Sequence, residues 1–215
     1  MAKRTLRPVT IEGRTIARSF WGKRWCAHLE SFSDYANRLP RGRTYARSGA
    51  IRHLQIHAGR IEATVKGSRA RPYQVDIRVK RLPAPTWKAI RASCSGQIGS
   101  MLELLRGSLS DHVMEVVSAP DSGLFPKPRQ IELACSCPDW ATMCKHVAAV
   151  LYGVGNRLDD SPELLFRLRG VDPAELISAE TVLPDGAAAG ADTLAEDQLG
   201  DIFDIDLDDL DADRQ

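Results

Sequence analysis

The sequence predicts an α+β fold in which an antiparallel meander of three strands is set between helical segments. Between residues 51 and 79, apolar and polar residues alternate in three short runs separated by turn sequences, which is typical of strands with one buried face. On both sides of this region, apolar residues recur at intervals of three and four, which is typical of amphipathic helices. A cluster of three cysteines and one histidine then follows between residues 135 and 146.

The first element expected is an aromatic-rich helix that begins near Ser19, a residue type that caps helix N-termini. Its two tryptophans, Trp21 and Trp25, are expected to pack in the core, because aromatic residues at helical spacing usually face inward. Cys26 and His28 have no second ligand pair nearby, so we interpret them as a packed thiol and a surface imidazole.

A basic stretch at residues 37–49 contains proline and glycine and is expected to form an exposed loop. Guanidinium groups can grip phosphate oxygens and a tyrosine can stack on a base, so this loop is a candidate contact for DNA or RNA. The alternative is an ordinary solvated loop whose arginines meet acidic neighbours. The candidate nucleic-acid-binding residues here are Arg38, Arg41, Arg43, Tyr45 and Arg47, and the turn before the third strand adds Arg69 and Arg71.

The three strands are expected to start near Ile51, Ile61 and Tyr73. Their polar face either is simply solvated or extends the basic surface, and it is expected to carry Arg52, His53, Lys66, Arg78 and Lys80. Helical periodicity then predicts helices near 87–92, 98–105 and 111–117, with Cys94 as a free thiol that is at least partly buried. The proline-rich residues 120–129 are expected to form a linker.

The cysteine and histidine cluster has the spacing C-x-C, six residues, then C-x-H. Cys135, Cys137, Cys144 and His146 supply three thiols and an imidazole, which match the ligand set of a tetrahedral structural zinc site. An alternating run before Cys135 predicts a strand that ends at the first ligand pair. Apolar spacing after His146 predicts a helix that begins at the second pair. We also expect the ring of Trp140 to cover the site and exclude water.

Two other interpretations of the cluster are weaker. A disulfide would need an oxidising compartment, and the chain shows no secretory signal and an odd number of cysteines, five. A catalytic zinc keeps one position open for water, whereas four protein ligands are available here. We therefore expect one structural Zn²⁺ ion.

The cluster closely resembles the SWIM zinc finger, whose motif maps onto these four residues without a gap. The resemblance to small stand-alone bacterial SWIM proteins extends from about Phe20 to Ile177, and its clearest segments are residues 19–26, 37–43, 124–126 and 144–152. It implies a zinc-binding module that contacts DNA or protein, often beside SWI/SNF-type helicase-like ATPases.

Charge divides the chain into a basic body and an acidic tail. Residues 1–129 hold 24 Lys and Arg against 9 Asp and Glu, whereas residues 180–215 hold 12 Asp and Glu and the single Arg214. Bulky apolar residues interleave with the aspartates, so the tail is either an interaction motif or a solubilising segment. We expect a basic arm at 1–18, a basic α+β domain at 19–119, the zinc finger with short helices at 120–179, and a flexible acidic tail at 180–215.

These observations favour a non-enzymatic adaptor that contacts nucleic acid, a helicase-like ATPase, or both. The alternative is a pure protein-interaction subunit whose basic face meets an acidic protein surface. No Ser/His/Asp set, phosphate-binding glycine loop or pair of carboxylates in an evident pocket indicates an enzyme. Because no apolar run is long enough to cross a membrane, we expect a soluble cytoplasmic protein.

Overall fold

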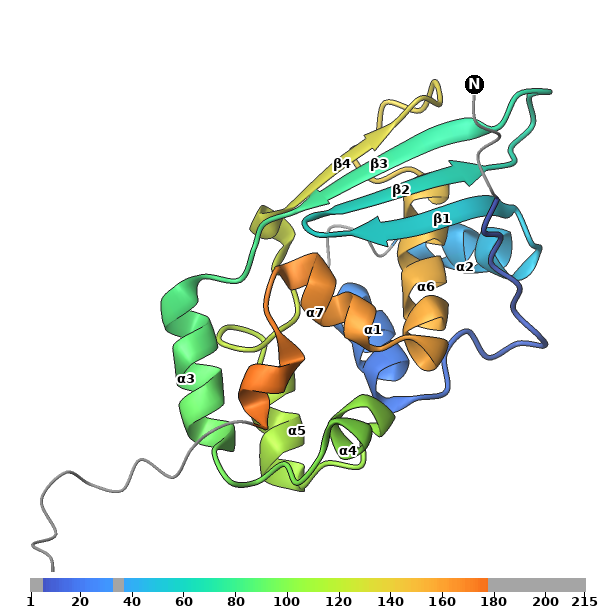
Figure 1. Cartoon of the computed structure of the whole chain (residues 1–215). Helices are drawn as coiled ribbons and strands as arrows, with labels where there is room; N and C mark the ends of the chain where they lie inside the picture. Colours follow the sequence, from blue (N-terminus) through green and yellow to red (C-terminus); the bar gives the residue numbers. More distant parts are fainter. Residues whose placement is uncertain (1–5, 33–36, 178–215) are drawn as a thin grey trace, which may run out of the picture. The chain divides into compact units, whose positions relative to one another are not determined.

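The computed structural model describes residues 6–32 and 37–177, so the acidic tail predicted at 180–215 lies outside the described residues. Figure 1 shows helices and strands in the mixed α+β arrangement that the sequence predicts. The strands are β1 (Ile51–His57), β2 (Arg60–Val65), β3 (Tyr73–Val79) and β4 (Ile131–Cys135). The helices are α1 (Phe20–Glu30), α2 (Leu39–Arg47), α3 (Ala84–Cys94), α4 (Met101–Arg106), α5 (Asp111–Ser118), α6 (Lys145–Asp160) and α7 (Glu163–Arg169).

The strands form one antiparallel sheet in the order β1-β2-β3-β4, which confirms the predicted meander. The strand predicted before the ligand cluster also forms, and it adds to the edge of this meander. In its register, Cys135 lies opposite Val75 and Leu133 lies opposite Ile77 of β3. The metal-binding segment therefore shares a sheet with the elements that precede it.

Within the basic arm, residues 7–9 lie along the opposite edge of the sheet, beside β1. The backbone N–H of Val9 donates to the carbonyl of Ile51 (3.2 Å), and the N–H of Leu54 donates to the carbonyl of Arg7 (2.9 Å). Val9 is buried. These contacts cover the edge strand β1, which a sheet would otherwise expose to pairing with another chain.

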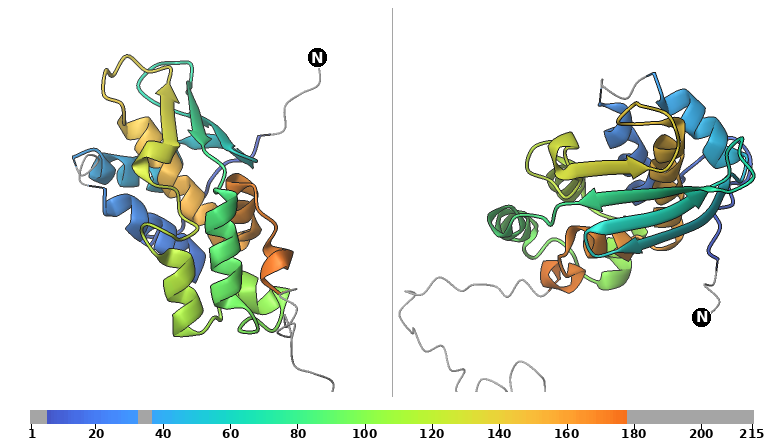
Figure 2. Two further views of the ribbon diagram at one scale, coloured as in Figure 1. Left: turned by 90° about the vertical axis from the view of Figure 1, so that its left-hand side faces the viewer. Right: turned by 90° about the horizontal axis from the view of Figure 1, so that it is seen from above.

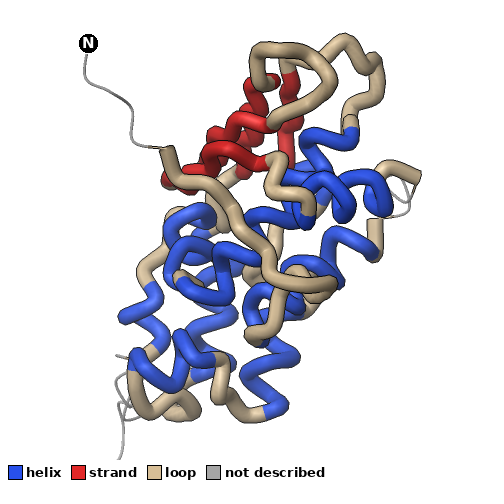
Figure 3. Tube along the Cα trace, turned by 90° about the vertical axis from the view of Figure 1, so that its right-hand side faces the viewer, coloured by secondary structure: helices blue, strands red, loops and turns tan. Residues whose placement is uncertain are grey.

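The helices cover one face of the sheet, as the views from two further sides show (Figures 2 and 3). Helix α6 lies against this face, and α1 and α2 pack on α6 in turn. All residues of α6 from His146 to Gly155 are buried. Trp21 and Trp25 are buried as predicted, and each indole N–H donates to a backbone carbonyl, of Leu104 (2.9 Å) and Leu151 (2.8 Å) respectively.

Ion pairs neutralise part of the outer face of the sheet. On β2 and β3, Arg60 pairs with Glu62 and Asp76, and Arg78 lies 3.6 Å from Asp76. Opposite charges on neighbouring strands therefore balance here. His53, expected on this polar face, is buried, and its Nδ1 accepts a hydrogen bond from the N–H of Arg7 (3.1 Å).

The stretch predicted as an exposed basic loop instead contains helix α2. Its buried residues Leu39, Gly42 and Ala46 lie three and four positions apart and face α6. Pro40 stands in the first turn, where a helix tolerates proline because the N–H that it lacks would have no partner there. Pro40 therefore marks the start of a helix, and Gly42 marks the point where α2 and α6 approach closely.

Packing also differs from expectation in the predicted linker and beside α1. Leu124 and Phe125 of the linker are buried, and the Phe125 ring lies 5.6 Å from the ring of His28. His28 is half-buried and its Nε2 lies 3.0 Å from the carbonyl oxygen of Pro126, so it is not a surface imidazole. Burial lowers the pKa of His28 and raises the pKa of Cys26 to about 12.

The contact between α2 and α6 makes a stability prediction. A Cβ atom at Gly42 would lie only 2.4 Å from the Cβ of Ala148, so Gly42→Val should separate the two helices. We expect the free energy of unfolding to fall by about 1–3 kcal/mol, as in other overpacked cores. The measurement is chemical denaturation, with Arg41→Val on the exposed side of the same helix as control. Equal stability of the two variants would contradict the close contact.

Candidate metal centre

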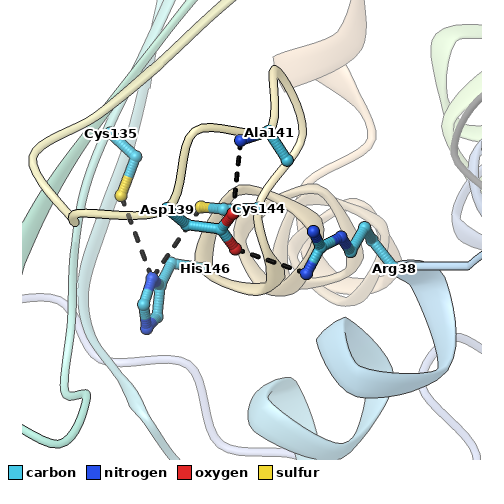
Figure 4. Close-up of polar contacts among 6 residues, drawn as sticks. All are labelled: Arg38, Cys135, Asp139, Ala141, Cys144 and His146. Carbon is cyan, nitrogen blue, oxygen red and sulfur yellow. Dashed lines mark hydrogen bonds and ion pairs between the residues drawn. The ribbon is translucent and has the colours of Figure 1, made fainter.

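The four predicted ligands come together where β4 ends and α6 begins. Their sulfur and nitrogen donor atoms all lie within 4.8 Å of one another. Nδ1 of His146 is 3.8 Å from Sγ of Cys144 and 4.0 Å from Sγ of Cys135, and both sulfur atoms face it (Figure 4). Zinc bond lengths of about 2.3 Å to sulfur and about 2.0 Å to nitrogen place tetrahedral sulfur and nitrogen ligands about 3.6 Å apart. The spacing of the donor atoms therefore fits a single zinc ion.

Backbone structure positions the two ligand pairs. Beyond the end of β4, the N–H of Ser136 donates to the carbonyl of Gln74 (2.9 Å), and the N–H of Gln74 donates to the hydroxyl of Ser136 (2.9 Å). Cys144 is the N-cap of α6, with extended backbone angles, and its carbonyl accepts the N–H of Ala148 (3.0 Å). One pair therefore extends from a strand and the other opens a helix, as predicted.

Hydrogen bonding between the thiols shifts the pKa values of Cys144 and Cys135 in opposite directions. Hydrogen bonding from the Cys135 thiol, helped by His146 and the backbone N–H of Val147, lowers the pKa of Cys144 to about 3. The same bond, together with burial, raises the pKa of Cys135, because its proton is held by the neighbouring sulfur. One thiolate is therefore favoured before any metal binds, and a bound zinc ion favours the thiolate form of the others.

His146 presents one ring nitrogen to the thiols and buries the other. The residue is 4% exposed, and its Nε2 has no hydrogen-bond partner among the described residues. Its ring packs against Tyr73, with centroids 4.5 Å apart, and against Tyr45, with centroids 5.5 Å apart. Gly67 completes this wall, because a Cβ there would lie 2.3 Å from the Tyr73 ring. Nδ1 is therefore the atom placed to bind zinc.

Trp140 does not cover the site as expected. Its side chain is completely exposed, at 101% of the reference value, whereas Tyr73 and Tyr45 supply the aromatic contacts to His146. The prediction named the wrong aromatic residue, because Tyr73 and Tyr45 are distant from the ligands in the sequence and only the fold brings them to His146.

The loop that carries Trp140 is held to the start of α2. Oδ1 of Asp139 accepts the N–H of Ala141 (3.2 Å), and its Oδ2 lies 3.4 Å from Nη1 of Arg38 (Figure 4). The Asp139 side chain therefore forms a turn between the two ligand pairs.

The structure separates the candidate nucleic-acid-binding residues into two groups. In the first group the side chains are engaged internally. Arg38 pairs with Asp139, Arg43 pairs with Glu30 and contacts the Tyr152 hydroxyl (3.2 Å), and Tyr45 lies beneath the ammonium of Lys145 (5.1 Å). In the second group no ion pair links the side chain to another described residue. This group is Arg41, Arg47, Arg69 and Arg71.

Three cysteines and one histidine that close all four positions of a tetrahedral ion define a zinc finger with one structural zinc. The family model of the SWIM zinc finger matches residues 117–154, and the chain belongs to this family. It is 35% identical over 196 residues to the uncharacterized protein Rv2102 of Mycobacterium tuberculosis, an alignment that covers 86% of this chain and 70% of the relative. No solved structure matches the chain.

The length and composition of the helices also bear on whether they could cross a membrane. Among the described helices, none combines the length and the apolar character needed to cross a bilayer. The longest described helix, α6, has 16 residues.

The metal centre makes the second prediction. Cys144→Ser should abolish stoichiometric zinc binding and unfold at least residues 130–158, because structural zinc supplies folding free energy of about 10 kcal/mol in small fingers. Zinc content by elemental analysis and thermal unfolding by circular dichroism are the measurements. Cys26→Ser, which alters a thiol outside the cluster, should keep one zinc per chain. A Cys144→Ser protein with normal zinc content and melting temperature would contradict the ligand assignment.

Proposed function

We propose that the chain is a non-enzymatic adaptor that binds nucleic acid with the end of its domain that holds the zinc centre. We call this surface the zinc end and define it by the β2–β3 turn (66–72), the loop between the ligand pairs (136–143) and helix α2. The single observation that carries the proposal is the presence there of exposed guanidinium groups, at Arg41, Arg69 and Arg71, that no ion pair links to another described residue.

The three parts of the zinc end are brought together by the fold. Val65 lies opposite Tyr73, and Val75 lies opposite Cys135, so the β2–β3 turn and the ligand loop leave the same end of the sheet. Gly67 of the turn approaches His146, and Tyr45 of α2 packs on the same ring. Zinc binding would therefore fix the framework on which the exposed arginines stand.

Charge distribution supports a phosphate-bearing partner. On the outer face of the sheet, Arg60 and Arg78 lie beside Glu62 and Asp76. At the zinc end, by contrast, Arg41, Arg69 and Arg71 form no ion pair with another described residue. Unpaired guanidinium groups bind phosphate oxygens and release the counterions condensed on a nucleic acid. Because Arg38 and Arg43 are already paired with acidic residues of the protein, we assign them the role of positioning α2.

Contact with a helicase-like ATPase is a separate proposal that rests on the family resemblance alone. Such an enzyme would act on the same nucleic acid, so one adaptor surface could serve both. A cytoplasmic location belongs to the same proposal, since zinc-binding thiols have to remain reduced.

The test is a fluorescence-anisotropy titration of labelled oligonucleotides with the zinc-loaded full-length protein at several salt concentrations. We expect binding that weakens steeply with salt, and Arg69→Gln with Arg71→Gln should lower the magnitude of the slope of log affinity against log salt by about 1–2. The matched control, Arg52→Gln with Arg78→Gln, removes the same charge from the sheet and should bind nearly as the unaltered protein does. Absence of binding even at low salt would favour the protein-interaction subunit instead.

A further inference from the structure

The side chain of Trp140 stands apart from every other tryptophan of the chain. Trp21, Trp25 and Trp87 are between 0% and 7% exposed, whereas Trp140 is fully exposed. Among the described residues, the other exposed large apolar side chains are Leu6 (62%) and Leu102 (57%). An indole offers about 150–250 Å² of largely apolar surface, and aromatic side chains of this kind are enriched at binding interfaces.

The loop holds this indole in place on both sides. Cys137 and Cys144, the ligands that flank the loop, would be tied to one zinc ion. Asp139, the residue before Trp140, bonds to the N–H of Ala141 and pairs with Arg38, and Met143 is buried. Fixing the backbone in this way reduces the entropy lost when the side chain binds, which is the benefit of preorganisation.

We infer that Trp140 is a base-stacking residue that selects single-stranded nucleic acid, an inference that rests on the proposed function. Single-strand sites combine cations that follow the phosphates with aromatic faces on which bases stack. The zinc end has both, since the turn that carries the exposed Arg69 and Arg71 leaves the same end of the sheet as the loop that carries the exposed indole. Bases in a duplex are covered by their neighbours, so a protruding indole gains a stacking partner only where a base is unpaired.

Tyr45, the aromatic residue that the sequence suggested for stacking, is less suitable. It is half-buried, one side packs against His146, and the Lys145 ammonium lies over its ring. An apolar pocket on a protein partner is the other occupant that an exposed indole could accept. The exposed arginines at the same end of the sheet favour the nucleic acid. The chemistry of the replacement side chain distinguishes the two occupants.

The experiment compares Trp140→Leu and Trp140→Phe in the zinc-loaded full chain, with a single-stranded oligonucleotide and its duplex as probes. Leucine keeps apolar surface but has no aromatic face, whereas phenylalanine can still stack. We expect Trp140→Leu to weaken single-strand binding by about 5- to 100-fold, the range of one base–aromatic contact. Trp140→Phe should recover most of this affinity, and duplex binding should change less than twofold. Leu102→Ala, which trims another exposed apolar side chain, is the matched control and should bind normally.

Tryptophan fluorescence gives a second readout in the unaltered protein. Because the other three indoles are buried, iodide should quench chiefly Trp140, and a bound single strand should protect it. Single-strand binding that Trp140→Leu leaves unchanged would overturn the stacking role while the arginine surface stands. Equal losses with single strand and duplex would overturn it as well. No binding of either probe by the unaltered protein would remove the proposed function itself.

Discussion

Helix α6 is the element on which the rest of the structure depends, because it is buried along most of its length and carries two metal ligands at its start. A helix that is apolar on all sides needs neighbours on all sides. The sheet supplies one, and α1 and α2 supply others. Anchoring Cys144 and His146 to Cys135 and Cys137 at the end of β4 then fixes where along the sheet the helix begins. Zinc binding and core packing are therefore two parts of one constraint.

The packing around α6 also explains why some arginines are paired within the protein. Arg43 and Tyr152 share the carboxylate of Glu30, which joins α2, α6 and α1 through polar groups at the edge of the core. Arg38 joins α2 to the ligand loop through Asp139. Arginines that hold the helices in this way are not available to a ligand, whereas Arg41, Arg69 and Arg71 form no ion pair with another described residue.

Local patterns were sufficient to predict much of this fold. Strand alternation gave the meander, the Ser19 cap gave the start of α1, and ligand spacing gave both the metal and the strand-to-helix junction. Expectations differed from the structure where tertiary contacts decide the outcome. Pro40 and Gly42 are loop signals unless the helix packs closely on Ala148. Likewise, Tyr73 and Tyr45, rather than the exposed Trp140, pack beside His146 although they are distant from it in the sequence.

The pairing of β4 with β3 determines whether the zinc finger can be transferred to another protein by itself. The segment matched by the family model, 117–154, starts within α5 and ends within α6, and it leaves β3 and the last turn and a half of α6 outside. A graft of that segment alone into another protein would carry a strand with neither edge paired and a helix without its apolar neighbours. Such a fusion would be expected to associate with itself. In this family member the zinc finger is therefore part of a larger fold and not a transferable cassette.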